Sequence, residues 1–415
     1  MSSRQVSAGR TTDAPTMLAR REVSFLIIAR FFALFGDYAS AFMIPVAVYT
    51  ATGSTALAGV AFTVRWLPEV LSLPVLGLLA ERFPMRGQLV VTDAARAAIL
   101  VVLVWQHSPV VLLIASGFLA LLNGHSLIAV ETAVARYVTA DAMADAQAKM
   151  QTAQQAAMIV GPALGGALLV WWQIGAGSAV VAALFLIAAT ATLALVRAEV
   201  MRRAPDSDPA AAGPVRKLVA GAVATGRNRP LVTLILITIT INLVGGLAMA
   251  ALPVIVVGEL AGNESAVGLV AGLASLASLG AAFAVNGALR RTTMARVAAV
   301  AFGALIVSAP AMGLSPSVVL FGLAYAVWMA GIAVFSIWMR TMRNQLVSQE
   351  ELGSTLGFFV AAVLASTPIA GVLLSVFGER MQAQALVLVA AAVSAVVLVP
   401  LSVAWRRQRA GTAST

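Results

Sequence analysis

Long blocks of apolar residues are the feature of this sequence that most limits how the chain can fold. Each block has about twenty residues or more, and a helix of that length spans the ~30 Å hydrocarbon core of a bilayer. Of the 415 residues, 60% are hydrophobic and 11% are charged, whereas a soluble domain carries about a quarter charged residues. Backbone polar groups in lipid need partners within their own segment, which a helix provides. The sequence therefore predicts an all-α polytopic membrane protein.

Twelve apolar blocks follow one another, and we expect each to be a transmembrane helix. They cover residues 24–50, 55–80, 88–106, 109–138, 148–172, 177–197, 231–257, 265–289, 295–314, 317–340, 353–377 and 383–405. The polar stretch APDSDPAAAGPVRK between the sixth and seventh blocks has the composition of a linker. The predicted regions are a disordered cytoplasmic arm at 1–20, a six-helix half at 21–197, a cytoplasmic linker at 198–230, a second six-helix half at 231–405 and a basic tail at 406–415.

The basic residues predict the orientation of the chain. If both termini are cytoplasmic, most of the 27 Lys and Arg residues fall in cytoplasmic loops and tails, and Arg380 alone falls in an outer loop. Cytoplasmic loops of membrane proteins carry this excess of positive charge. The net charge of +10 therefore indicates topology and not binding to nucleic acid. We expect a monomer that crosses a bacterial inner (plasma) membrane many times.

Several kinds of chemistry are excluded by what the sequence lacks. The chain has no cysteine and two histidines, which excludes disulfides and thiolate metal sites and disfavours a histidine-rich metal site. It also lacks the G-x-x-x-x-G-K-[ST] loop that binds nucleotide phosphates. We expect no cofactor, no metal ion, no enzymatic activity and no use of ATP.

Charged residues inside the apolar blocks occur in the first half of the chain. Placing a charge at mid-bilayer costs ~2.5–3.5 kcal/mol, so these residues need partners or a function. Arg65 and Glu69 are four residues apart and share one helix face, as do Arg30 and Asp37 at seven residues. In total three arginines (Arg30, Arg65, Arg96) face four acids (Asp37, Glu69, Asp93, Glu131).

This count leaves one negative charge in excess, which indicates a site for a proton. Arginine stays protonated, so an acid must take up the proton. Asp37, expected to be the least paired acid, is the first candidate for proton coupling, and Glu69, Glu131 and His125 are the others. The alternatives are fixed salt bridges that hold helices together and, for His125, a neutral hydrogen-bonded packing role.

Three stretches of sequence resemble motifs of a transporter family. The loop GLLAERFPMRG (77–87) resembles the G-x-x-x-D-R-x-x-x-R signature of the major facilitator superfamily, with Glu81 at the family's Asp position. The stretch around Arg30, Gly36-Asp37 and TATGST (50–55) resembles the drug and siderophore exporter branch, which includes the enterobactin exporter and macrolide efflux proteins. GPALGG (161–166) is similar to the antiporter motif of the superfamily's exporters.

The resemblance implies the fold, the activity and several site residues. The fold would be that of the superfamily, and the activity would be export of a small organic molecule by alternating access and proton antiport. A conformational lock would contain Gly77, Glu81, Arg82, Arg86, Asp93 and Arg96, although these basic residues could also only anchor the loop. Gly161, Pro162, Gly165 and Gly166 would form a helix kink, or serve packing alone.

Two departures from the family's pattern concern the coupling mechanism. The second-half copy of the loop, NGALRRTTMAR from Asn286, has no acid. The fourth block has Asn123-Gly124-His125 where many proton antiporters of the superfamily carry an arginine.

The partners we expect are a small-molecule substrate, protons and the lipid bilayer. Candidates for the substrate cavity are Phe35, Tyr38, Trp66, Asn123, Asn242, Tyr325 and Trp328. Three alternatives remain: an importer of the same fold, a metal exporter resembling ferroportin, and a non-transporting membrane sensor or assembly subunit.

Overall fold

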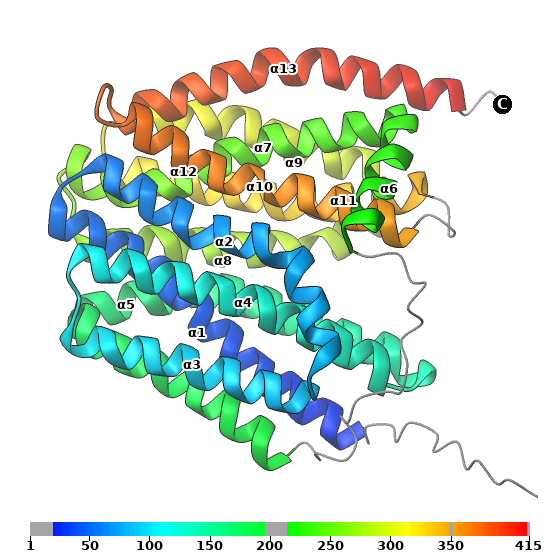
Figure 1. Ribbon diagram of the computed structural model, residues 1–415. Helices are drawn as coiled ribbons and strands as arrows, with labels where there is room; N and C mark the ends of the chain where they lie inside the picture. The colour runs from blue at the N-terminus through cyan, green and yellow to red at the C-terminus, as the bar shows by residue number, and fades with distance from the viewer. Residues whose placement is uncertain (1–19, 196–213, 348–351, 413–415) are drawn as a thin grey trace, which may run out of the picture.

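The computed structural model describes residues 20–195, 214–347 and 352–412, and almost all of them are helical (Figure 1). The first half contains α1 (Arg20–Thr52), α2 (Thr55–Arg82), α3 (Met85–Trp105), α4 (Pro109–Tyr137) and α5 (Ala140–Leu195). The second contains α6 (Pro214–Arg227), α7 (Arg229–Pro253), the π-helix η1 (Val254–Glu259), α8 (Glu264–Leu289), α9 (Met294–Gly313), α10 (Val318–Leu346), α11 (Leu352–Leu364), α12 (Ser366–Phe377) and α13 (Ala383–Thr412). Nearly all of the predicted arm and much of the predicted linker lie outside the described residues.

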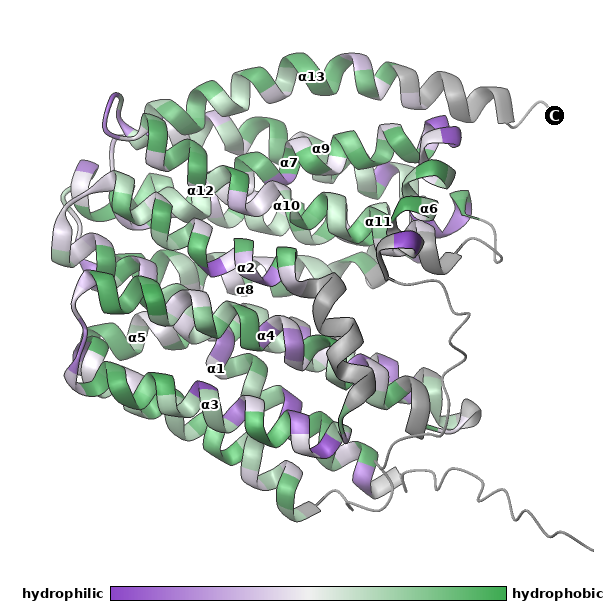
Figure 2. Cartoon of the chain, viewed as in Figure 1, coloured by the Kyte–Doolittle hydropathy of each residue, from purple (hydrophilic) through white to green (hydrophobic). Residues whose placement is uncertain are grey.

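Ten helical segments among the described residues are long and apolar enough to cross a membrane. Figure 2 shows hydrophobic residues along most of the helices, with hydrophilic residues at their ends and in a group within α1–α4. Many large apolar side chains, such as Leu269 and Val300, are exposed on the outside of the bundle, as expected for a surface that faces lipid. The predicted all-helical, membrane-spanning architecture is confirmed, and the count of twelve spans stays a prediction.

Helix α5 is interrupted and reverses its direction. Gln173 has φ 56° and ψ −177°, values outside the helical region. On the two sides of this residue the chain returns to the same neighbours, because Gly165 and Gly177 both lie against Met43 of α1 and Gly177 also contacts Leu168. The two parts of α5 therefore lie side by side. No other residue inside α5 has non-helical backbone angles, so the helix continues through Pro162.

Two segments of the second half differ from uniform α-helices. Helix α7 ends at Pro253 and continues as η1, and α11 and α12 are separated only by Ala365. Proline lacks a backbone N–H, which removes one helical hydrogen bond and favours such local changes. In addition, α6 lies within the segment predicted to be an irregular linker and packs against α11.

Among the described residues, the two halves meet mainly through two pairs of helices, α2 with α12 and α5 with α8, and α7 also contacts α1 and α2. At both contacts the backbones approach closely. A Cβ atom on Gly59 would lie 2.6 Å from the carbonyl oxygen of Gly371, and one on Gly166 would lie 2.4 Å from the Cα of Gly268. Small residues allow this packing where no hydrophobic force draws helices together in lipid. The start of α1 and the end of α13 lie at the same end of the bundle, on opposite sides of it (Figure 1).

Candidate functional site

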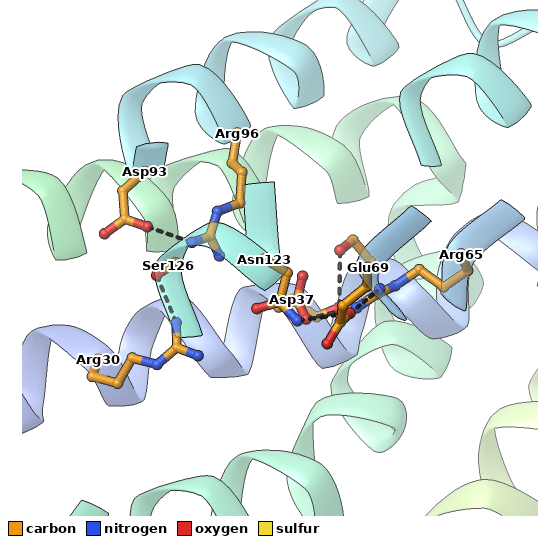
Figure 3. A network of polar contacts seen from close by, with 9 residues as sticks. Arg30, Asp37, Arg65, Glu69, Asp93, Arg96, Asn123 and Ser126 are labelled. Carbon is orange, nitrogen blue, oxygen red and sulfur yellow. Dashed lines mark hydrogen bonds and ion pairs between the residues drawn. The ribbon is translucent and has the colours of Figure 1, made fainter. Parts of the chain in front are cut away.

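A buried group of three charged residues lies between α1 and α2 (Figure 3). Arg65 Nη2 is 2.6 Å from Asp37 Oδ2, and Arg65 Nη1 is 3.2 Å from Glu69 Oε2. Asn123 of α4 donates a hydrogen bond from Nδ2 to the same Glu69 oxygen at 3.1 Å. The side chains of Arg65 and Asp37 are each 1% exposed, and that of Glu69 is 10% exposed. One guanidinium therefore holds two carboxylates; this group, with Asn123, is called the Arg65 cluster.

A second buried group, the Arg30–Arg96 cluster, joins α1, α3 and α4. Arg30 Nη1 donates to the Ser126 hydroxyl at 2.8 Å, and Arg96 Nη2 is 3.1 Å from Asp93 Oδ1. The Arg96 guanidinium also lies over the ring of Phe185, 4.8 Å from its centroid, a favourable cation–π arrangement. Asp93 and Arg96 are paired, as their spacing of three residues along α3 predicts.

The structure changes the count of buried charges that the sequence indicated. Glu131 is exposed on α4 and so does not belong to either cluster. Apart from Glu22 near the start of α1, the buried charged residues in the described part are three arginines and three acids. For the seven residues that the sequence indicated, the excess of one negative charge is therefore wrong, because the fourth acid, Glu131, is exposed.

The expectation that Asp37 is the least paired acid is also wrong. Its carboxylate bonds to Arg65 of the next helix, while the described contact of Arg30 is with Ser126. Asp37 and Arg30 share a face of α1, but Arg65 reaches Asp37 first because α2 packs against α1 there. Asp37 is thus firmly paired. His125 is half-buried near these groups on α4, and its Nδ1 has no hydrogen-bond partner among the described residues.

Only part of the predicted conformational lock can be placed. The side chains of residues 73–82, which include Gly77, Glu81 and Arg82, lie outside the described part of the structure. Arg86 Nη2 donates to the backbone oxygen of Leu193 at the end of α5. Asp93 and Arg96 lie deeper, in the buried cluster. The described residues of the predicted lock therefore lie at two sites: Arg86 contacts the end of α5, and Asp93 and Arg96 belong to the buried Arg30–Arg96 cluster.

The glycines of GPALGG all lie at close helix contacts. Gly161 and Gly165 pack against Tyr38 and Ala39 of α1, and Gly166 packs against Gly268 of α8. A side chain at any of these three glycines would meet an atom closer than 3 Å. The motif therefore brings α5 against both halves of the protein.

The predicted cavity residues lie at several places in the described part of the bundle. Trp66 and Asn123 lie beside the Arg65 cluster, where the Arg65 guanidinium is 5.0 Å from the Trp66 ring centroid. Phe35 stacks on Phe31, and Tyr325 stacks on Phe321. Tyr38 packs against Gly161, and Asn242 is half-buried on α7.

Trp328 lines an apolar cavity of the second half. The cavity has a volume of about 330 Å³ and lies between α7, α9, α10 and α13. Its lining residues include Phe302, Leu305, Leu388 and Ser394, which the sequence did not single out. No local pattern marks such residues, because four separate helices supply them.

The sequence also did not predict a hydrogen-bonded contact between the two halves. The Glu379 carboxylate, just beyond α12, accepts hydrogen bonds from the Ser54 hydroxyl at 2.9 Å and the Ala56 N–H at 3.0 Å. These donors lie at the start of α2, where a helix N-terminus favours a negative charge. The Ala56 N–H and the Ser54 hydroxyl hold the pKa of Glu379 below its ordinary range. Among the described residues, no three His, Cys, Asp or Glu side chains are grouped to hold a metal ion.

Comparisons with known proteins agree with this architecture. A model of the Major Facilitator Superfamily matches residues 26–362. No curated protein matches the sequence. Solved structures with the same fold include the nucleoside transporter NupG, which is 14% identical with a TM-score of 0.71 and coverage of 92% of this chain and 98% of that one.

Two further solved structures are those of bacterial proteins. One is a homolog of the human lysosomal transporter Spinster, inward-facing and unoccupied, which is 14% identical with a TM-score of 0.69 and coverage of 94% and 97%. The other is a homologue of the iron transporter ferroportin in an inward-facing state, which is 16% identical with a TM-score of 0.69 and coverage of 93% and 100%. At these identities the likeness establishes the fold alone.

Proposed function

Because the chain belongs to the major facilitator superfamily, we propose that it exports a small organic molecule, drug-like or siderophore-like, in exchange for protons. The family indicates a multi-pass transport protein and not an enzyme. The export direction rests on the exporter-like GPALGG motif, whose glycines pack at α1 and α8. The proposed location is the bacterial inner membrane, with the protein as a monomer.

The proposed topology has twelve spans and cytoplasmic termini. The segment Asp145–Ala194 is one of the ten apolar segments, and we propose that it crosses the membrane twice because it reverses at Gln173. Helix α2, with 28 residues, is long enough to add another. Basic residues such as Arg86, Arg229 and Arg296 lie at the starts of α3, α7 and α9, and the positive-inside rule places that end in the cytoplasm.

Alternating access is supported by where the two halves touch. Two contacts between the halves lie near the end of the bundle opposite to the described ends of the chain. They are the hydrogen bond between Ser54 and Glu379 and the close backbone contact of Gly59 with Gly371. With the termini inside, this end is extracellular and is closed. We propose on this basis that the described conformation is inward-facing, so that cargo would enter from the cytoplasm.

The coupling proposal rests on one observation: in the Arg65 cluster a single arginine contacts two carboxylates. Arg65 keeps its charge and faces two carboxylates. One carboxylate can accept a proton while the other still forms the ion pair. Glu69 is the acid we assign to proton exchange, because its contact with Arg65 is longer and its side chain is more exposed than that of Asp37. The ion pair between Asp37 and Arg65 then remains when Glu69 is neutral.

Coupling of this kind would move the helices through a change of charge. With Glu69 ionised, Arg65 and Asn123 tie α2 to α1 and α4. A proton on Glu69 weakens its contacts with both partners, which loosens the polar link between α2 and α4. Since α2 also packs on α12 of the other half, such a change can bias the equilibrium between inward-facing and outward-facing states.

The test begins with the cargo. We would express the protein in a bacterial strain without its own drug pumps and measure retention of ethidium and of a catecholate siderophore. The exported compound is then used with purified protein in liposomes under a pH gradient. We expect Glu69→Gln and Asp37→Asn to lose at least about tenfold in proton-driven transport, because each removes one carboxylate from the shared arginine.

A matched control is Glu264→Gln, which neutralises an acid at the start of α8, away from the cluster. It should transport at the wild-type rate. Exchange of unlabelled for labelled cargo without a pH gradient should persist in Glu69→Gln, since that reaction needs no proton. Wild-type rates of proton-driven transport in both cluster variants would refute the coupling proposal, and accumulation of cargo in the cells would refute export.

A further inference from the structure

Helix α6 has an exposed face that combines apolar and basic side chains. Its described exposed residues are Arg216, Val219, Ala220, Val223, Gly226 and Arg227. These residues follow one another at helical spacing, so they lie on one side of α6. The two valines are 56% and 51% exposed. The exposed face of α6 therefore has an apolar centre with an arginine near each end.

The opposite face of α6 packs against the bundle. Gly221 and Thr225 are buried, and the helix contacts α11, α7 and α2. Just after α6, Asn228 Nδ2 donates a hydrogen bond to the backbone oxygen of Leu346 at 2.8 Å, which joins the turn between α6 and α7 to the end of α10. These contacts fix which side of α6 is directed away from the protein.

The position of α6 places its exposed face near the membrane surface. Figure 1 shows α6 lying across α7 and α11, at the end of the bundle where α1 starts and α13 ends. Because α7 and α11 belong to membrane-spanning segments, the axis of α6 runs roughly parallel to the membrane. Only Asn228 separates α6 from α7, whose apolar segment begins at Arg229. Helix α6 therefore lies at the level of the lipid headgroups.

The charges around α6 indicate which lipids fit. The sequence from Pro214 to Gly258 contains no Asp or Glu, while Arg216, Arg227 and Arg229 are exposed. The cytoplasmic leaflet is negatively charged and attracts basic side chains that lie near it. Helices in the interface insert apolar side chains below the headgroups and place basic ones beside them. A helix that faces only water carries polar residues on its outer side, where α6 has two valines.

We propose that α6 is an interfacial helix whose exposed face binds anionic lipids of the cytoplasmic leaflet. Val219 and Val223 insert beneath the headgroups, and Arg216 and Arg227 donate hydrogen bonds to lipid phosphates, which guanidinium groups bind well. The choice of leaflet rests on the proposed topology, in which this end of the bundle is cytoplasmic. The lipid contact itself rests on the exposed face of α6 and on its position.

The experiment measures how far α6 is shielded from water. The chain has no native cysteine, so a spin label is attached at Val223→Cys in the full-length protein. Nanodiscs contain phosphatidylcholine alone or an equal mixture with phosphatidylglycerol. Accessibility to a neutral, water-soluble nickel complex should fall by at least about twofold in the mixture, because anionic lipid attracts the nearby arginines. Accessibility to oxygen, which dissolves in lipid, should rise.

Two controls separate binding of anionic lipid from a general effect of the bilayer. A label at Gly287→Cys, an exposed position of α8 where an added Cβ meets no atom within 4 Å, should give the same accessibility in both lipids. Removing two charges from α6 with Arg216→Gln and Arg227→Gln should abolish the response of the label at Val223→Cys. Removing two exposed charges elsewhere, with Arg290→Gln and Arg291→Gln, should leave that response intact.

The result does not depend on transport. The measurement needs neither cargo nor a pH gradient, and both leaflets of the nanodisc have the same composition, so the lipid contact is tested separately from export and from topology. A label at Val223→Cys that is equally accessible to nickel in both lipids would overturn the proposal. An unchanged response after the loss of Arg216 and Arg227 would also overturn it.

Discussion

Arg65 is the residue on which the buried charges of α1 and α2 depend. Its planar guanidinium has donors in a fixed fork, and it uses separate nitrogens for Asp37 and Glu69. A buried carboxylate without its partner is much less stable than the intact pair. Arg65 is therefore needed both for stability and for the proposed coupling.

We predict that Arg65→Gln destabilises the folded protein by about 3–5 kcal/mol, the range for breaking a buried ion pair. Arg65→Lys should lie between this variant and wild type, because a single ammonium group cannot bond both acids with the same geometry. The free energy of unfolding, measured by reversible titration with SDS, checks this. Arg291→Gln removes an exposed arginine and serves as the control. Equal stability of Arg65→Gln and Arg291→Gln would contradict the assigned role.

Helices α5 and α8 hold the two halves together through backbone contact. Gly166 and Gly268 face each other so closely that a Cβ on Gly166 would lie 2.4 Å from the Cα of Gly268. A backbone atom cannot move aside as a flexible side chain can. Any larger residue at Gly166 must therefore separate the helices, and with them the two halves at the closed end.

We expect Gly166→Val to shift the protein toward the conformation that is open at this end. The chain has no native cysteine, so spin labels can be attached at Gln106→Cys and Leu314→Cys, which replace exposed residues just beyond α3 and α9 in the two halves. Pulsed electron spin resonance should detect a longer distance between the labels in Gly166→Val. The control is Gly280→Val on α8, where an added Cβ meets no atom within 4 Å. If both variants gave the wild-type distance, the contact would not determine closure.

At the scale of the whole molecule, the hydrogen-bonded contact of Glu379 between the halves depends on pH. Glu379 accepts from Ser54 and Ala56, and these bonds lower its pKa below the ordinary value of about 4.5. When the halves separate, the carboxylate loses both donors and its pKa returns to that value. The contact therefore stabilises the closed end above pH 4.5, and the stabilisation disappears as the pH falls through the lowered pKa.

We predict that the distance between labels at Gln106→Cys and Leu314→Cys stays constant as the pH falls from 8 toward 4.5 and increases only as it falls further, through the lowered pKa of Glu379. Glu379→Ala should increase the open fraction at neutral pH by roughly twofold to fivefold, the range for a contact between exposed groups. It should also remove the response to acid below pH 4.5. Glu264→Gln, with its acid at the start of α8, should behave as wild type. Opening of the wild type between pH 7 and pH 5 would contradict the sign of the pKa shift.

The sequence by itself determined the class of the protein and the contacts within single helices. Apolar blocks predicted the membrane helices, and the loop and GPALGG motifs predicted the superfamily. Spacing along one helix predicted that Arg65 would face Glu69 and that Asp93 would face Arg96, and both pairs are present. These features follow from a helix that has 3.6 residues in each turn, whatever its surroundings.

Only the tertiary structure decided which helices supply the remaining partners. Asp37 pairs with Arg65 and not with Arg30 on its own helix face, and Arg30 bonds to Ser126, 96 residues away. Glu131 is predicted to be buried from its position in an apolar block, yet it is exposed because that side of α4 faces outward. Such contacts depend on how each helix is rotated and placed against its neighbours, which packing of the whole bundle determines and the spacing along one helix does not.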